Sequence, residues 1–171
     1  MIAGLAETGF ADPRPPVLVL SVGNQLLRDD GVGVELLAEL AHDIDPCTVE
    51  FVDGGTQGLA LLSVIGGRRS VLVLDAIALG AAPGTVHVLR DEAAREARPP
   101  RATSAHEGNA GDLLSVAELL GERPEQVVIL GVEPGLVETG IGLSPAVSRA
   151  LPEAVRQARG VLAELLGENQ R

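Results

Sequence analysis

The sequence predicts an α/β protein in which a twisted, mostly parallel sheet lies between two layers of helices. Short runs of Val, Leu and Ile without polar alternation are typical of strands that are buried on both faces. These runs alternate with segments of helical periodicity along the whole chain, which favours right-handed crossovers between parallel strands. The 171 residues are the size of one domain, and 46% of them are hydrophobic while only 1% are aromatic. We therefore expect a core of Leu, Val, Ile and Ala.

Residues 1–16 are expected to form a flexible tail, and residues 17–171 a single domain. The tail ends in a proline-rich segment and lacks the basic start and apolar stretch of a secretory signal. The first strand is predicted at 17–22, where VLVLSV is apolar almost throughout. A polar turn follows at 24–30, and helical spacing of apolar residues then predicts a helix at 31–41.

The middle of the chain is expected to contain three more strands. A second strand at 49–52 ends in the turn sequence Asp-Gly-Gly-Thr, and a helix at 59–65 is stopped by two glycines. The third strand, at 70–74, is apolar throughout and leads directly to Asp75. Polar and apolar residues alternate at 85–89, so we expect the fourth strand to lie at an exposed edge.

A long loop separates the fourth strand from the next helix. Residues 91–108 are expected to be the least structured stretch, and a loop of this length in a small domain is typical of a lid or a binding loop. A helix is predicted at 112–120, a fifth strand at 126–132 and another loop at 133–142.

The last helix is expected to have a marked beginning and an interruption. Ser144 followed by Pro145 is typical of a helix start, since serine caps the first turn and proline suits the first helical position. Pro152 cannot donate the hydrogen bond that a continuing helix needs. The sequence therefore predicts a short helical turn and then a separate helix at 153–166.

Charge and composition exclude several classes of partner. The chain has 13 basic residues, all of them Arg, against 24 acidic residues, and its formal net charge of −11 disfavours nucleic acid. No apolar run approaches the roughly 20 residues that span a bilayer, so we expect no membrane partner. The single cysteine, Cys47, cannot form an internal disulfide, which indicates a reducing, cytoplasmic environment. We expect a monomer.

Acidic residues follow the predicted strands. In an open α/β sheet, sites form beyond the carboxyl ends of the strands, and side chains placed there come close together. Carboxylates that gather in this way persist where a cation or a shared proton offsets their repulsion. Together with one imidazole, the set suits a divalent ion such as nickel, zinc, cobalt or manganese. The candidates are Asp29, Asp30, Asp53, Asp75, His106 and Glu133.

Each candidate also has a simpler structural interpretation. Asp30 can complement the dipole at a helix N-terminus, Asp53 and Asn24 can serve as turn residues, and His106 can be a solvated loop side chain. Asp75 is harder to explain in this way, because no turn residue accompanies it. His42, His87 and Cys47 receive no role. Chemistry alone therefore predicts a candidate metal site with open positions, which also permits a metal-dependent hydrolase of a small molecule.

Several motifs in order resemble the hydrogenase maturation endopeptidases, from about residue 17 to residue 155. One position departs from the family pattern, since Ser21 stands where the opening motif usually has Gly. The motifs are VLVLSVGNQLLRDDGVGVELLAEL (17–40), FVDGGTQGLALL (51–62), VLVLDAIALGAAPGTVHVLR (71–90), SAHEGNAGDLL (104–114) and VVILGVEPGLVETGIGLSPAVSRALPEAV (127–155).

The resemblance implies a five-stranded sheet and a defined activity. Such proteins remove a C-terminal peptide from the large-subunit precursor of nickel–iron hydrogenase after nickel insertion, so the precursor is the expected partner and nickel arrives with it. Asp30, Asp75 and His106 are implied as the metal-contacting, catalytic residues. The substrate-binding residues are expected to be Asn24, Asp53, Gly54, Gly55 and Thr56. A metal-sensing chaperone that binds a precursor without cutting it is the alternative, because no Ser or Cys protease apparatus is evident in the sequence.

Overall fold

The computed structural model describes residues 14–42, 44–96 and 110–168, and its strands form one sheet in the order β2-β1-β3-β5-β4. Four strands are mutually parallel, and the edge strand β4 runs antiparallel to β5. The expectation of a mostly parallel sheet with an exposed fourth strand is therefore confirmed. The strands are β1 (Val17–Ser21), β2 (Val49–Asp53), β3 (Ser70–Ala76), β4 (Val86–Arg90) and β5 (Gln126–Val132).

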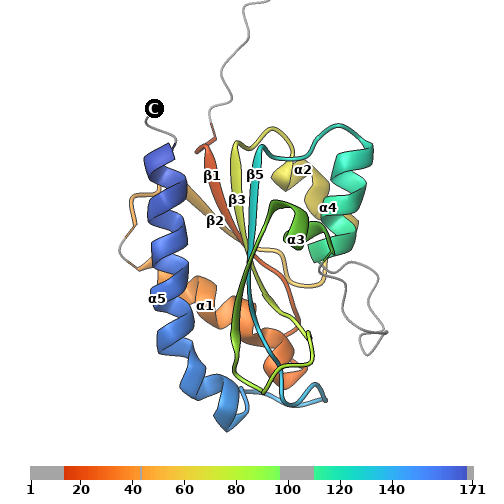
Figure 1. The fold of residues 1–171 in the computed structure, drawn as a ribbon, viewed down its shortest axis with the longest axis vertical. Helices are drawn as coiled ribbons and strands as arrows, with labels where there is room; N and C mark the ends of the chain where they lie inside the picture. Colours follow the sequence, from red (N-terminus) through yellow and green to blue (C-terminus); the bar gives the residue numbers. More distant parts are fainter. Residues whose placement is uncertain (1–13, 43, 97–109, 169–171) are drawn as a thin grey trace, which may run out of the picture.

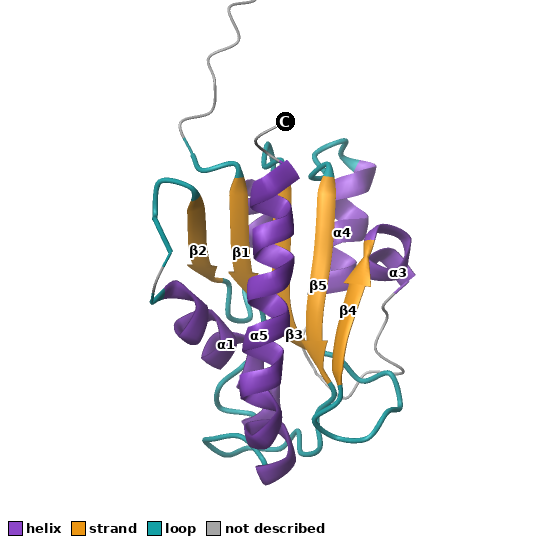
Figure 2. Ribbon diagram, turned by 60° about the vertical axis from the view of Figure 1, so that its left-hand side comes forward, coloured by secondary structure: helices purple, strands orange, loops and turns teal. Residues whose placement is uncertain are grey.

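Helices cover both faces of the sheet and complete three layers (Figures 1 and 2). One face carries α1 and α5, while α2, α3 and α4 lie on the other. Two short 3₁₀ turns, η1 (Arg28–Gly31) and η2 (Gly58–Leu61), precede α1 and α2. The helices are α1 (Val32–Ala41), α2 (Leu62–Ile65), α3 (Asp91–Glu96), α4 (Ala110–Leu119) and α5 (Pro145–Glu168).

The alternation of side chains along each strand builds two apolar cores. In β1, Val17 and Val19 pack towards α1 and α5, whereas Leu18 and Leu20 pack towards α2 and α4. Successive residues of a strand point to opposite faces, so a strand with helices on both sides must be apolar at every position. This requirement explains why the run at the start of β1 shows no polar alternation.

The predicted interruption at Pro152 is wrong. Helix α5 continues from Pro145 to Glu168 with Pro152 inside it, and the ribbon in Figure 1 is unbroken. Pro152 is exposed, so the carbonyl that loses its helical donor can accept from water. Buried Val147 and Ala154 hold the helix against the core on both sides of the proline. Tertiary burial therefore overrides the local tendency to break.

The stretch at 91–108 is also more regular than expected where the structure describes it. Residues 91–96 form helix α3, and its Ala94 is fully buried in the core beneath α4. The sequence Asp-Glu-Ala-Ala-Arg-Glu contains good helix formers, and burial of Ala94 gives that short helix the tertiary contact it needs. Residues 97–108 lie outside the described part of the chain.

The end of the predicted N-terminal tail is attached to the domain. Arg14 donates hydrogen bonds to the carbonyls of Ser63 and Gly66, and the buried Arg68 donates to the carbonyl of Pro15. Residues 1–13 lie outside the described ranges. None of the helices in the described ranges is long and apolar enough to cross a membrane.

Candidate functional site

The carboxyl ends of β1, β2 and β3 are joined by backbone hydrogen bonds. The amide of Gly54 donates to the carbonyl of Ser21, and the amide of Val22 donates to the carbonyl of Leu74. Helix α1 begins against this edge because Gly33 has no side chain: a Cβ there would lie 2.4 Å from the Leu74 carbonyl oxygen. The close approach brings Asp30, just before α1, towards Asp75 near the end of β3.

Asp75 is a buried carboxylate at the end of a rigid strand. Its residue is only 8% exposed, and its Oδ1 accepts a hydrogen bond of 2.7 Å from the amide of Ala76. The amide of Ala110, at the first turn of α4, also donates to it. Burial and, secondarily, the charge of Asp30 raise the pKa of Asp75 to about 8, despite these two amide donors. A carboxyl group in this setting favours a proton or a cation.

Asp30 lies in η1 and is partly buried. Its Oδ2 accepts a hydrogen bond of 2.8 Å from the amide of Asn24. The turn that holds this amide leaves no room for a side chain at Gly23, because a Cβ there would lie 2.0 Å from the carbonyl oxygen of Asp30. The structure thus places two of the three predicted metal-contacting residues within electrostatic reach of each other.

Two residues predicted to bind substrate make local turn contacts. The Asn24 Oδ1 accepts from the amide of Leu26, and the Asp53 Oδ1 accepts from the amide of Gly55. Asp53 also accepts a hydrogen bond of 3.1 Å from the buried hydroxyl of Ser21. Ser21, which departs from the family pattern, therefore has a partner on the neighbouring strand.

His106 lies outside the residues that the structure describes. Ala110, four positions later in the sequence, is the residue whose amide donates to Asp75. Within the described ranges, no group of three or more His, Cys, Asp or Glu side chains could hold a metal ion. The third predicted ligand thus stays a prediction.

Asp29 has a structural role that sequence reasoning missed. Its fully buried carboxylate accepts hydrogen bonds of 2.6–2.8 Å from the amides of Gly135, Leu136 and Ser144. Burial works to raise the pKa of Asp29, but these donors together outweigh burial and hold the pKa below its ordinary value. The three amides lie more than 100 positions away in the sequence, so no local signal distinguished Asp29 from Asp30.

His87 and Glu133 also form a contact that the sequence did not indicate. His87 Nε2 lies 3.1 Å from Glu133 Oε2, although no pattern in the sequence assigned His87 a role. Burial opposes ionisation of Glu133, yet amide donors from Leu79, Gly80 and Ala81 and the His87 side chain hold its pKa below the usual range. Pairing of β4 with β5 brings these distant positions together.

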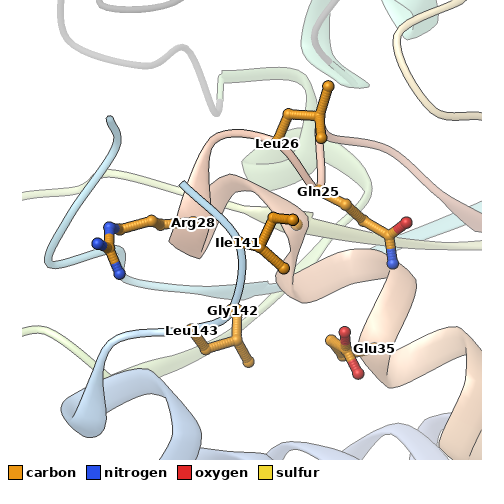
Figure 3. A pocket seen from close by; sticks show the side chains of 8 residues that line it. Gln25, Leu26, Arg28, Glu35, Ile141, Gly142 and Leu143 are labelled. Atoms are coloured by element: carbon orange, nitrogen blue, oxygen red, sulfur yellow. The ribbon is translucent and has the colours of Figure 1, made fainter. Parts of the chain in front are cut away.

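A groove lies beside η1, between the turn at 24–27 and the loop before α5 (Figure 3). We call it the rim groove; it encloses about 240 Å³. Gly31, which directly follows Asp30, is one of its lining residues. Its other lining residues are Gln25, Leu26, Arg28, Glu35, Ile141, Gly142 and Leu143.

Comparisons with known proteins agree on one family. A family model described as hydrogenase maturation protease matches residues 34–160. The hydrogenase 2 maturation protease of Escherichia coli is 38% identical over 150 residues, which cover 86% of this chain and 91% of that protein. The hydrogenase expression/formation protein HupD of Rhodobacter capsulatus is 36% identical over 150 residues, or 84% of this chain and 71% of that protein.

Solved structures give the same result. The hydrogenase maturating endopeptidase HybD from Escherichia coli matches with a TM-score of 0.78 and 37% identity, covering 86% of this chain and 92% of that one. A hydrogenase 2 maturation peptidase from a thaumarchaeon matches with a TM-score of 0.65 and 28% identity, covering 86% and 97%. The endopeptidase hypothesis is thereby favoured over a chaperone that does not cut. The chain belongs to the hydrogenase maturation protease family and is an endopeptidase.

Proposed function

We propose that this endopeptidase removes the C-terminal extension of a nickel–iron hydrogenase large-subunit precursor after nickel has been inserted. The names of its relatives support a hydrogenase as the substrate. Nickel is then part of the substrate, and the protease recognises it before the peptide bond is cut. The observation that carries the proposal is the buried Asp75 carboxyl group facing the charge of Asp30 at the edge of the sheet.

Asp30, Asp75 and His106 are proposed to bind the nickel of the precursor. Two carboxylates and one imidazole form an oxygen and nitrogen donor set that suits a borderline divalent cation. Asp75 fits this role, because a cation offsets both its burial and its repulsion by Asp30. When bound, the metal supplies a positive charge that orients the precursor and polarises the groups it contacts.

The strand and the turns around these carboxylates prepare the site for the precursor. Asp75 is held by the sheet, and its oxygen is fixed by the Ala76 amide, so it is aimed before the substrate arrives. We propose that Asn24 and residues 53–56 contact the precursor chain. Asp53 and Thr56 are exposed, and hydrogen bonds join their segment to the turn that carries Asn24.

Processing of a matched pair of precursors tests this function. The protein is incubated with the hydrogenase large-subunit precursor of its own organism, with and without nickel, and each new C-terminus is read by mass spectrometry. We expect a defined C-terminal peptide to be lost only from the nickel-loaded form. Equal processing of both forms would overturn recognition of nickel, and no processing of either would overturn the choice of substrate.

We also propose that the protein acts as a monomer in the cytoplasm. Its single cysteine, Cys47, is exposed, which a reducing compartment tolerates. Sedimentation of the purified protein at several concentrations tests the monomeric state, and cell fractionation tests the location.

A further inference from the structure

The rim groove has walls that are already fixed to each other. The amide of Arg28 donates to the carbonyl of Gly140, and the amide of Gly140 donates to the carbonyl of Leu26, so the two loops form a short parallel bridge. Asp29, in η1, also connects the two loops, because its carboxylate accepts hydrogen bonds from three amides of the loop before α5. A ligand that enters this groove therefore meets a preformed surface, which lowers the entropic cost of binding.

Large apolar side chains are exposed at the rim groove. Leu26 is 62% exposed and Ile141 is 84% exposed. Leu26 belongs to the turn at 24–27 and Ile141 to the loop before α5, and both line the groove. Leu136 and Val137, on the same loop as Ile141, are 44% and 39% exposed. Apolar side chains gathered at a concave surface mark binding sites more often than isolated exposed residues do.

The polar side chains of the rim groove give it a negative character. Glu35 and Gln25 lie on the same side of the groove in Figure 3, and neither side chain has an ion pair or hydrogen bond within the described part of the chain. Arg28 also lines the groove, but its Nε lies 3.2 Å from Glu138 Oε1, and in Figure 3 its side chain extends away from Glu35. The charge of Arg28 is therefore paired with Glu138 and not with Glu35. The formal net charge of −11 strengthens the attraction for basic surfaces.

We propose that the rim groove docks a segment of the substrate protein in which an apolar side chain stands next to a Lys or Arg. The apolar side chain contacts Leu26 and Ile141, and the basic group pairs with Glu35. This inference rests on the proposed function and adds a docking surface for the precursor beside the candidate carboxylates. Gly31 lines the groove and directly follows Asp30, so a docked segment lies next to the candidate carboxylates.

Two variants of the groove and two matched controls test the proposal. Ile141→Ser removes an apolar contact, and Glu35→Gln removes the charge while keeping the shape. Leu119→Ser is the control for Ile141, since Leu119 is 85% exposed on α4 at the other face of the sheet. Glu39→Gln is the control for Glu35, because Glu39 is exposed on the same helix but does not line the groove.

Each variant is measured in two ways against the large-subunit precursor. Binding of the nickel-free precursor measures docking without turnover. Single-turnover cleavage of the nickel-loaded precursor, at increasing protease concentration, gives the half-saturating protease concentration and the maximal cleavage rate separately. We expect Ile141→Ser to weaken binding about tenfold, since it removes an apolar contact that becomes buried when the segment docks. We expect Glu35→Gln to weaken it about threefold and to reduce the dependence on salt. We expect the groove variants to keep the maximal cleavage rate of the wild type, and both control variants to bind and cleave like the wild type.

The outcomes separate the docking surface from the proposed function. Groove variants that bind and cleave like the wild type overturn the docking surface and leave the function intact. If the wild type binds the precursor but cuts neither form, the proposed function fails, and the docking surface is then tested by the effect of the groove variants on binding alone. A lower maximal rate with unchanged half-saturation overturns docking, and so does a dimer in sedimentation that Ile141→Ser dissociates, because a second copy would then fill the groove.

Discussion

The Asp75 carboxyl group combines deep burial with a like-charged neighbour, and this costs the metal-free protein stability. Its pKa of about 8 in the folded protein lies well above the ordinary value of 3.8. Between these two values the folded state binds a proton that the unfolded state has released. The stabilising contribution of this proton is fully present below about pH 4 and is lost as the pH rises through 8. The site thus favours a cation at neutral pH.

Replacing Asp75 by Asn should stabilise the metal-free protein at high pH. Asn keeps the size of the side chain and has no charge to bury, so the free energy of unfolding at pH 9 should rise by a few kcal/mol, on the order expected for a large pKa shift. At pH 3, where Asp75 is protonated in both the folded and the unfolded state, the difference should nearly vanish. Urea unfolding at both pH values measures this. A variant that is less stable than the wild type at pH 9 would contradict the predicted origin of the shift.

The same substitution should abolish precursor processing. Loss of one of the proposed metal-contacting carboxylates should lower the cleavage rate by at least about 100-fold, since even changes behind such ligands cost roughly 10- to 100-fold. Asp53→Asn should cleave nearly normally, because Asn can accept the hydrogen bonds from Gly55 and Ser21. His106→Ala should behave like Asp75→Asn. Cleavage at saturating protease, with thermal melting as a folding control, decides the ranking. An inactive Asp53→Asn beside an active Asp75→Asn would move the reactive centre to the 53–56 segment.

At the scale of elements, Asp29 connects η1 to the loop that precedes α5. Asp29→Asn places an amide nitrogen against amide donors, so we expect the free energy of unfolding to fall by about 2–4 kcal/mol. Because the pKa of Asp29 is lowered in the folded state, the wild-type contribution is present above about pH 4 and is lost as the pH falls further. Urea unfolding at pH 7 and at pH 3.5 measures both effects.

Asp45→Asn provides the control for that experiment. Among the described residues, the Asp45 side chain accepts only a local hydrogen bond from the amide of Cys47, and it lies at an exposed turn. We expect its substitution to change the free energy of unfolding by less than about 0.5 kcal/mol. Equal effects of the two substitutions would show that the Asp29 contacts do not fix the loop.

Helix α5 contains a second element-scale feature, the exposed proline at 152. Pro152→Ala restores a donor for the carbonyl of Ser148 and removes a steric conflict, at the cost of a less restricted unfolded chain. We therefore expect a stability gain of about 1–2 kcal/mol with no change in processing. Thermal unfolding and precursor cleavage measure the two properties. A loss of stability would contradict the expectation that the helix tolerates Pro152 only because burial on both sides holds it.

At the scale of the whole molecule, the net charge of −11 means that the acidic side chains repel one another more strongly in the compact folded state than in the unfolded chain. Added salt screens this repulsion, so the urea midpoint at pH 7.5 should rise when sodium chloride is increased from about 20 to 200 mM. Closer to the isoelectric point of about 4.6, the effect should shrink. Urea titrations at pH 7.5 and pH 5.5 provide the comparison. A midpoint that is insensitive to salt at both pH values would contradict this account.

The sequence by itself determined the three layers and the positions of the five strands along the chain. An apolar run such as 126–132 is recognisable because a strand covered on both faces has no polar position, and its bounds match β5 residue for residue. Asp75 was recognisable for the same reason, since a carboxylate at the end of such a run has no local purpose. Four of the five motifs that carried the family resemblance begin in one of the strands, at residues 17, 51, 71 and 127.

Only the tertiary structure decided what depends on contacts between distant residues. Burial of Ala94 makes α3 a helix, and packing on both sides of Pro152 keeps α5 whole. The three amides that Asp29 binds, and the Glu133 carboxylate beside His87, come from segments that local patterns cannot pair. Local propensity is worth a fraction of a kcal/mol per residue, whereas each buried contact contributes more, so tertiary packing decides wherever the two disagree.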